Sequence, residues 1–180
     1  MVLTPDNSWN WVFDQKHQHL CLHLGQEWLF VSAFDEKWLT PNTAYPKPFS
    51  FLHAEEFQSG LDSLEHQSFG TQEQRIELIF NLIAARHFVR PLMPKSWFFQ
   101  LSNIIVYPRL YKLVAVETKI QMATFIVIDS NEQSSLLMLI DEQCLLTENK
   151  SLAKFELIKV MNDRLMPLKQ LSSAKEIVAA

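Results

Sequence analysis

The chain has little glycine and cysteine, and it has no long uninterrupted apolar run. Three glycines occur in 180 residues, at positions 25, 60 and 70, whereas phosphate-cradling loops need several glycines in close order. The only cysteines, Cys21 and Cys144, are expected to be reduced, buried thiols. Apolar runs such as residues 136–140 fall far short of the roughly 20 residues that span a bilayer. These absences exclude a nucleotide hydrolase, a disulfide-stabilised secreted protein and a membrane-spanning protein.

Missing motifs and the overall charge exclude further classes. No Gly-x-Ser-x-Gly, His-Glu-x-x-His or Cys-x-x-Cys sequence is present, so the commoner hydrolase and zinc signatures are absent. Residues 1–6 contain a proline and an acid rather than the basic and apolar stretches of an export signal. The net charge of −4 gives no overall attraction to nucleic acid. We therefore predict a cytoplasmic protein that is not an enzyme and has no cofactor, nucleic-acid partner or membrane association.

Two groups of β-type patterns are present. In the first half, residues 9–13 and 20–24 alternate apolar and polar side chains, and residues 27–32 form a third run, which predicts a small antiparallel meander. In the second half β-type runs dominate and predict a small barrel or sandwich. These runs cover residues 97–101, 104–107, 110–116, 124–128, 136–140 and 143–147.

Three helices are expected. Residues 72–89 give the strongest prediction, because Thr71 and Gln74 form a capping-box pattern, and two apolar stripes indicate packing on more than one side. Residues 53–66 are a weaker candidate, because they contain a glycine. A terminal helix is predicted over residues 154–165 from the apolar residues that share one helical face, Leu157, Ile158, Met161 and Leu165.

The predicted fold class is α+β. Composition changes near Pro91, which suggests an N-terminal α/β domain over residues 1–91, with a small antiparallel sheet and helices. The C-terminal domain, residues 92–180, is expected to be β-rich and barrel-like with a terminal helix. A chain of this length buries a sufficient core without metal or disulfide.

One set of possible metal ligands lies in and just before the second β-type run, residues 20–24. His17, His19, Cys21 and His23 point to the same face if this stretch is a strand. The opposite face carries three leucines and would take the core, which leaves the histidines on a solvated sheet surface. Because no converging ligand from elsewhere can be identified, the solvated surface is the favoured interpretation, and no metal site is predicted.

Charge is segregated along the chain. Acidic residues dominate positions 55–77, whereas positions 86–119 are basic apart from Glu117. A basic surface could attract an acidic partner if these side chains converge. Arginine and tryptophan, which occur close together as Arg90 and Trp97, are enriched at interface hot spots. For Trp97, packing in the second core is the favoured interpretation.

Four stretches resemble the ZapC family of cell division proteins from γ-proteobacteria. They are Pro5-Asp6 followed by Trp9-x-Trp11-x-x-Asp14, then Phe34-x-x-Lys37-x-Leu39-Thr40-Pro41, then Met93-Pro94-Lys95-Ser96-Trp97, and finally Lys159-x-Met161-Asn162-Asp163-Arg164-Leu165-x-Pro167. Their order and spacing fit the family over most of the chain, whereas residues 42–70 and 103–150 depart from it.

The resemblance implies a cytoplasmic protein that binds the tubulin-like protein FtsZ directly. It would promote lateral bundling of FtsZ polymers, lower their GTPase activity and stabilise the division ring at the septum, acting as a two-domain monomer without catalysis of its own. The family supplies no metal ligand or catalytic residue that could be transferred to this chain.

Two surfaces are candidates for the FtsZ contact. One is a basic edge of Arg90 and Lys95 with Arg164 beside it, since charge complementarity speeds and orients docking on an acidic protein. The other is an apolar pocket in the aromatic-rich first half. Its residues would be Leu22, Trp28, Phe30, Phe34 and Trp38.

Alternative functions remain open at this point. The aromatic pocket could serve a small-molecule-binding protein or an uncharacterised enzyme, and Tyr107, Tyr111 and Trp97 could stack on RNA bases. The small apolar end of the chain, residues 176–180, resembles tails that ATP-dependent proteases read, which suggests regulated turnover.

Overall fold

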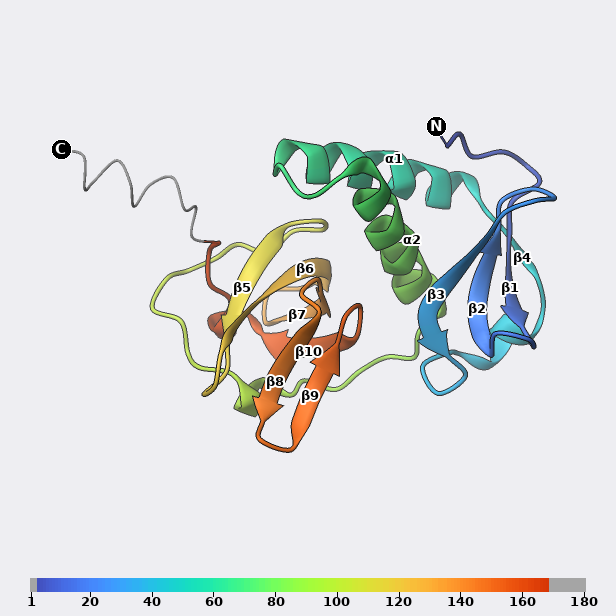
Figure 1. Ribbon diagram of the computed structural model, residues 1–180. Helices are drawn as coiled ribbons and strands as arrows, with labels where there is room; N and C mark the ends of the chain where they lie inside the picture. The colour runs from blue at the N-terminus through green and yellow to red at the C-terminus, as the bar shows by residue number, and fades with distance from the viewer. Residues whose placement is uncertain (1–2, 169–180) are drawn as a thin grey trace. The chain divides into compact units, whose positions relative to one another are not determined.

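The computed structural model describes residues 3–168, and the chain divides into two compact units, Met1–Leu92 and Met93–Ala180 (Figure 1). The first unit combines a sheet with two helices, and the second consists of β-strands and short 3-10 helices. The architecture is therefore α+β, as predicted. Within residues 3–168, no helix combines the length and apolar content needed to cross a membrane.

The first unit contains a four-stranded antiparallel sheet. Its strands β1 (Asn10–Asp14), β2 (His19–His23), β3 (Leu29–Asp35) and β4 (Lys47–Pro48) lie in the order β3-β2-β1-β4. Trp11 pairs with Leu22, and Leu22 pairs with Phe30, so these apolar side chains share one face of the sheet. The predicted meander is confirmed.

The two helices of this unit both begin with a capping box. In α1 (Phe51–His66) the pair is Ser50 and His53, and in α2 (Gln72–Phe88) it is Thr71 and Gln74. The start of α2 agrees with the prediction. The start of α1 lies two residues earlier than predicted, because a histidine here takes the place of the usual Glu or Gln of the box. The 3-10 helix η1 (Pro41–Ala44) precedes them.

Close helix packing explains the glycine inside α1. A Cβ at Gly60 would lie 2.5 Å from Cδ1 of Ile79, so the missing side chain lets α1 approach α2. Phe80 of α2 stacks on Phe57 at 5.0 Å and meets Phe30 of β3 at 5.1 Å between ring centroids. This helix is packed on more than one side, as predicted, and its buried residues are Leu78, Ile79, Phe80, Asn81, Leu82, Ile83, Ala84, Ala85 and Phe88.

The second unit is built from antiparallel strands. The strands are β5 (Leu113–Glu117), β6 (Met122–Ser130), β7 (Ser134–Leu139), β8 (Gln143–Thr147), β9 (Lys150–Ala153) and β10 (Leu157–Met161). Four form a sheet in the order β10-β7-β6-β5, and β8 and β9 form a separate hairpin. Among the described residues the strands form no closed barrel, so the barrel-like prediction is corrected to two antiparallel sheets.

The predicted terminal helix over residues 154–165 is wrong. Phe155 turns the chain with a φ of 68°, β10 then pairs with β7, and the 3-10 helix η3 (Asn162–Arg164) follows. Ile158 lies opposite Leu137 in the sheet. A short apolar run with helix-like spacing cannot be distinguished from a buried strand by periodicity alone, and here pairing with a distant strand decides the outcome.

The first two strands predicted for the second half are also absent. Residues 97–101 begin with the 3-10 helix η2 (Ser96–Phe98), and residues 104–107 form no strand. The core of this unit is formed instead by Phe99 together with side chains of the later strands. It includes Val114, Val116, Phe125, Val127, Leu137, Leu139, Ile158, Val160 and Leu165.

Candidate protein-binding surfaces

Arg90 lies at the end of the first unit and is held by backbone carbonyls. Its backbone N–H donates to the Trp38 carbonyl at 2.8 Å, and its Nε donates to the Leu39 carbonyl at 2.5 Å. The residue is exposed and lines a pocket of about 530 Å³ whose wall includes Phe13 and Pro41. The structure therefore fixes the guanidinium at a surface of mixed polar and apolar character.

Lys95 and Arg164 belong to the second unit, where they flank Ser96. The Lys95 N–H donates to the Lys159 carbonyl at 2.8 Å, and Ser96 Oγ accepts from the Met161 N–H at 2.8 Å. Arg164 Nε donates to the Ser96 carbonyl at 3.3 Å. Two stretches almost seventy positions apart in the sequence thus lie together. One guanidinium nitrogen of Arg164 also pairs with the neighbouring Asp163 carboxylate, which offsets part of its charge.

Trp97 points to solvent, which corrects the expectation that it packs in the second core. It is 69% exposed, whereas Phe99 is 5% exposed and meets Phe125 at 6.3 Å between ring centroids. A strand over residues 97–101 would have placed Trp97 and Phe99 on the same face. The 3-10 helix η2 breaks that alternation, so one aromatic ring enters the core and the other does not.

Trp97 is part of a longer exposed stretch, residues 93–107, which we call the apolar segment. Its exposed large side chains are Met93, Trp97, Leu101, Ile104, Ile105 and Tyr107. The backbone is nevertheless fastened to the unit, because Gln100 N–H donates to the Glu117 carbonyl at 2.7 Å and Ser102 N–H to the Asp163 carbonyl at 2.8 Å. The sequence pattern singles out Trp97 and Tyr107 but not Leu101, Ile104 and Ile105, because their β-type residues favour buried strands.

The five residues predicted to form an aromatic pocket have different environments. Leu22 and Phe34 are buried in the core. Phe30 and Trp38 are half-buried, and each packs against another aromatic ring. Trp28 alone of the five is strongly exposed, at 59%. The aromatic content of the first half therefore serves mainly to fill the core between the sheet and α2.

Trp28 has exposed apolar neighbours on the edge strand β3. Leu29 and Val31 are also exposed, and β3 ends the sheet order. Part of this edge is covered, because the Ala33 N–H donates to Oδ1 of Asn81 at 2.8 Å. The first unit thus also presents apolar side chains to solvent along this edge.

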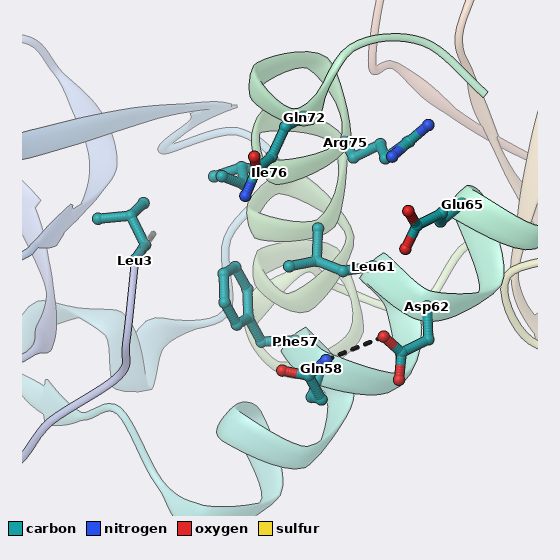
Figure 2. A pocket seen from close by; sticks show the side chains of 9 residues that line it. All are labelled: Leu3, Phe57, Gln58, Leu61, Asp62, Glu65, Gln72, Arg75 and Ile76. Atoms are coloured by element: carbon teal, nitrogen blue, oxygen red, sulfur yellow. Dashed lines mark hydrogen bonds between the residues drawn. The ribbon is translucent and has the colours of Figure 1, made fainter. Parts of the chain in front are cut away.

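A smaller pocket of about 260 Å³ lies against the two helices (Figure 2). Its polar side chains interact with groups close by. Gln58 Nε2 donates to Asp62 Oδ1 at 2.9 Å, and Arg75 Nε donates to the Phe69 carbonyl at 2.6 Å. Because Gln58, Asp62 and Arg75 already bond to groups of the helix pair and its connection, the side chains that line this pocket form no evident reactive centre.

A buried charge cluster joins α1 to α2. Glu56 is 5% exposed, and its carboxylate accepts from Arg86 Nε at 3.0 Å and lies 2.7 Å from His87 Nε2. Burial pulls the pKa of Glu56 upward, but the hydrogen bond and charge of His87, followed by those of Arg86, outweigh it and leave the pKa below its ordinary value. The cluster is explained by helix packing, since its partners satisfy the buried carboxylate.

Across the described residues the most prominent surface feature is exposed apolar area on an ordered backbone, close to basic side chains. Buried polar groups such as Glu56 serve the fold. Exposed apolar area of this kind is typical of a protein-interaction surface, and comparison with known sequences identifies the family.

The chain belongs to the ZapC family, a family of non-enzymatic cell division proteins. Residues 2–90 match the family model "Cell-division protein ZapC, N-terminal", and residues 91–171 match "Cell-division protein ZapC, C-terminal". The cell division protein ZapC of Ferrimonas balearica is 42% identical over 180 residues, covering all of both chains. ZapC of Shewanella oneidensis is 34% identical over the same full length, and ZapC of Photobacterium profundum is 35% identical over 91% of this chain and 92% of its own.

Proposed function

We propose that this chain binds FtsZ polymers directly, promotes their lateral bundling, lowers their GTPase activity and stabilises the division ring at the septum. Its membership of the ZapC family supports FtsZ as the partner. The observation that carries the proposal is the apolar segment, in which large exposed side chains accompany Lys95 and the backbone contacts Arg164.

The apolar segment has the chemistry of a binding surface. Met93, Trp97, Ile105 and Tyr107 are 79%, 69%, 80% and 79% exposed, so a partner that covers them removes a large apolar area from water. Tryptophan and tyrosine are enriched among the residues that dominate interface energies. Lys95 adds positive charge, which accelerates and orients docking on an acidic filament. Binding is therefore expected to weaken as salt concentration rises.

A monomer that bundles filaments has to contact two of them, and candidate residues occur in both units. Arg90 and the exposed Trp28 belong to the first unit, whereas Lys95, Arg164 and the apolar segment belong to the second. One contact surface in each unit allows a single chain to join two polymers. Bundling then needs no self-association of this protein.

Co-sedimentation with FtsZ polymers formed in GTP tests the role of the apolar segment. Trp97→Ala and Ile105→Ser each remove exposed apolar area and are expected to weaken binding by about 2 kcal/mol, a roughly 30-fold higher Kd. Ile120→Ser is the matched control, because Ile120 is a 47% exposed apolar residue of the same unit, in the turn between β5 and β6. It should leave binding unchanged.

The basic residues are tested in the same assay. Arg90→Asp with Lys95→Asp is expected to reduce co-sedimentation and its dependence on salt, while Lys119→Asp, at an exposed lysine of the β5–β6 turn, should not. Undiminished pelleting of the Trp97, Ile105 and double-charge variants would contradict the proposed surfaces. Failure of the wild-type chain to pellet with FtsZ would contradict the proposed function itself.

A further inference from the structure

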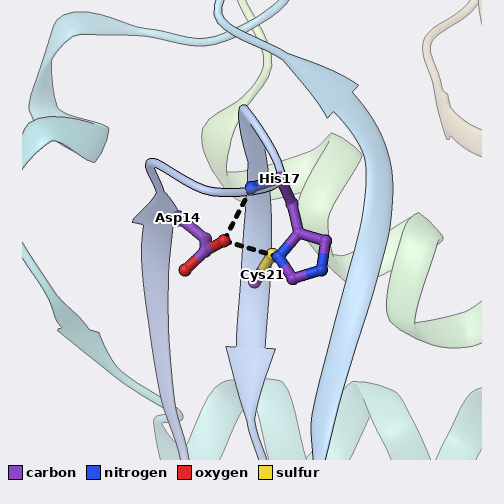
Figure 3. A group of neighbouring side chains, drawn as sticks. All are labelled: Asp14, His17 and Cys21. Atoms are coloured by element: carbon purple, nitrogen blue, oxygen red, sulfur yellow. Dashed lines mark hydrogen bonds and ion pairs between the residues drawn. The ribbon is translucent and has the colours of Figure 1, made fainter.

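Three potential metal ligands of the first unit lie together at one end of the β1–β2 pair. Asp14 ends β1, His17 lies in the turn that follows, and Cys21 lies in β2 (Figure 3). One ligand atom of each lies within 4.8 Å of the ligand atoms of the other two, and Asp14 Oδ2 is 2.5 Å from His17 Nδ1. A carboxylate oxygen, an imidazole nitrogen and a thiolate sulfur are the three donor types that zinc takes in proteins.

The turn between the two strands brings His17 back over the sheet. Asp14 Oδ2 accepts from the His17 backbone N–H at 2.8 Å, and the Asp14 carbonyl accepts from the Gln18 N–H at 2.8 Å. Gln18 adopts a φ of 57°, which reverses the chain within the turn. Figure 3 shows the His17 ring next to the Asp14 carboxylate and the Cys21 sulfur.

Strand register places Asp14 and Cys21 on a common face. Val12 pairs with Cys21, and Asp14 pairs with His19. Residues two apart along a strand point to the same side, so Asp14 and Cys21 are diagonal neighbours across the β1–β2 pair. The periodicity of the sequence puts His17 and Cys21 on one face, but Asp14 is the converging ligand that periodicity within one strand cannot identify.

The three donors differ in burial in a way that suits a cation entering from solvent. The Cys21 residue is fully buried, whereas the Asp14 and His17 side chains are 25% and 39% exposed. Burial, with a smaller effect of Asp14, raises the pKa of the Cys21 thiol to about 11, and its Sγ donates to the His19 carbonyl at 3.5 Å. A bound metal ion replaces that proton, which is released to solvent, and the sulfur coordinates as the thiolate.

We propose that Asp14, His17 and Cys21 form a binding site for a divalent transition-metal ion, with Zn²⁺ as the best fit to this donor set. Three protein ligands leave the fourth tetrahedral position to water or to a further donor. A bound ion links β1, the turn and β2, so it stabilises the sheet. That sheet includes the edge strand β3, against which α2 packs. The site shares no residue with the apolar segment and does not depend on the proposed function.

Titration of the metal-free full-length protein with Co²⁺ tests the site, because a cobalt–thiolate bond gives a charge-transfer band in the near ultraviolet. The wild-type chain and Cys144→Ser, which removes the other buried cysteine, should both show the band with one equivalent bound. Cys21→Ser should lose it. His17→Gln should also lose it or shift it to higher Co²⁺ concentration, and this exposed turn residue can be changed without disturbing the core.

Zn²⁺ provides a second readout that does not require a coloured ion. Addition of Zn²⁺ should raise the melting temperature of the wild-type chain and of Cys144→Ser, and leave that of His17→Gln unchanged. Circular dichroism without metal confirms that each variant is folded. The absence of a Co²⁺ band in the wild-type chain, or a band that survives Cys21→Ser, overturns the proposal and leaves the Asp14–His17 interaction as a feature of the turn alone.

Discussion

The ring of His53 is a hydrogen-bond acceptor in the capping box of α1. Its Nδ1 accepts the Ser50 backbone N–H at 3.2 Å, while Ser50 Oγ accepts the His53 N–H at the same distance. An accepting ring nitrogen requires the neutral imidazole. Burial lowers the pKa of His53 to about 4, with the charge of His87 acting in the same direction and Glu56 opposing it. The cap and the surroundings therefore both favour the uncharged ring.

This arrangement makes stability depend on pH. Between the ordinary histidine pKa of about 6.5 and the folded value of about 4, the unfolded chain binds more protons, so the free energy of unfolding falls as pH is lowered. At pH 5 the loss from His53 reaches about 2 kcal/mol. Below the ordinary pKa of Glu56, its lowered folded value adds a further loss. Urea unfolding at pH 7 and pH 5 measures the effect.

Substitution of His53 by glutamine isolates the contribution of this histidine to the pH dependence of stability. His53→Gln keeps an acceptor in the capping box but cannot titrate, so the difference in stability between pH 7 and pH 5 should shrink. His66→Gln, at the exposed end of the same helix, should retain the wild-type difference. Equal pH dependence of the wild-type chain and His53→Gln would show that the histidine is not the cause.

At the scale of elements, the distance between α1 and α2 depends on one glycine. An alanine Cβ at position 60 would lie 2.5 Å from Cδ1 and 3.0 Å from Cγ1 of Ile79, and Ile79 is fully buried. Gly60→Ala gains up to about 1 kcal/mol in helix propensity, but overpacking costs about 1–3 kcal/mol. We expect net destabilisation of about 1–2 kcal/mol in urea unfolding.

A second substitution tests whether the helix contact is the cause. Ile79→Val removes Cδ1, so the double variant should be more stable than the sum of the two single effects predicts. Ser59→Ala, at the exposed neighbouring position, is the control for helix propensity. A destabilised Gly60→Ala that Ile79→Val does not relieve would mean that another contact is responsible.

Elements set by local interactions were predictable, and those set by distant pairing were not. The start of α2 follows from Thr71 and Gln74, three positions apart, and residues 143–147 form the predicted strand. By contrast, residues 157–161 pair with β7, 19 to 27 positions earlier in the chain. Their helix-like spacing was a misleading local signal. The missed start of α1 depended on a histidine acting as a capping residue.

The candidate surface was predictable only in part, for the same reason. Lys95 and Arg164 could be singled out by charge and by the family motifs, but their meeting at Ser96 depends on a hydrogen bond across 68 positions. The exposure of Trp97 depends on the 3-10 helix η2, which no periodicity indicates. Family membership therefore follows from the sequence more directly than the binding surface does.

At the scale of the whole molecule, two units each present exposed apolar and basic side chains, which suits a protein that joins filaments. Arg90 represents the first unit, and Lys95 with the apolar segment represents the second. The turnover signal expected at residues 176–180 lies outside the described residues and stays a prediction. The proposed role of the intact chain is to act on FtsZ polymers.

Right-angle light scattering of FtsZ in GTP, recorded together with phosphate release, measures both proposed effects of the intact chain on FtsZ. We expect the wild-type chain to raise the scattering of FtsZ polymers and to lower their rate of GTP hydrolysis. Trp97→Ala and the Arg90→Asp, Lys95→Asp variant should do so much less, whereas Ile120→Ser should match the wild type. Unchanged scattering and unchanged hydrolysis on addition of the folded wild-type chain would show that it does not act on FtsZ polymers as proposed.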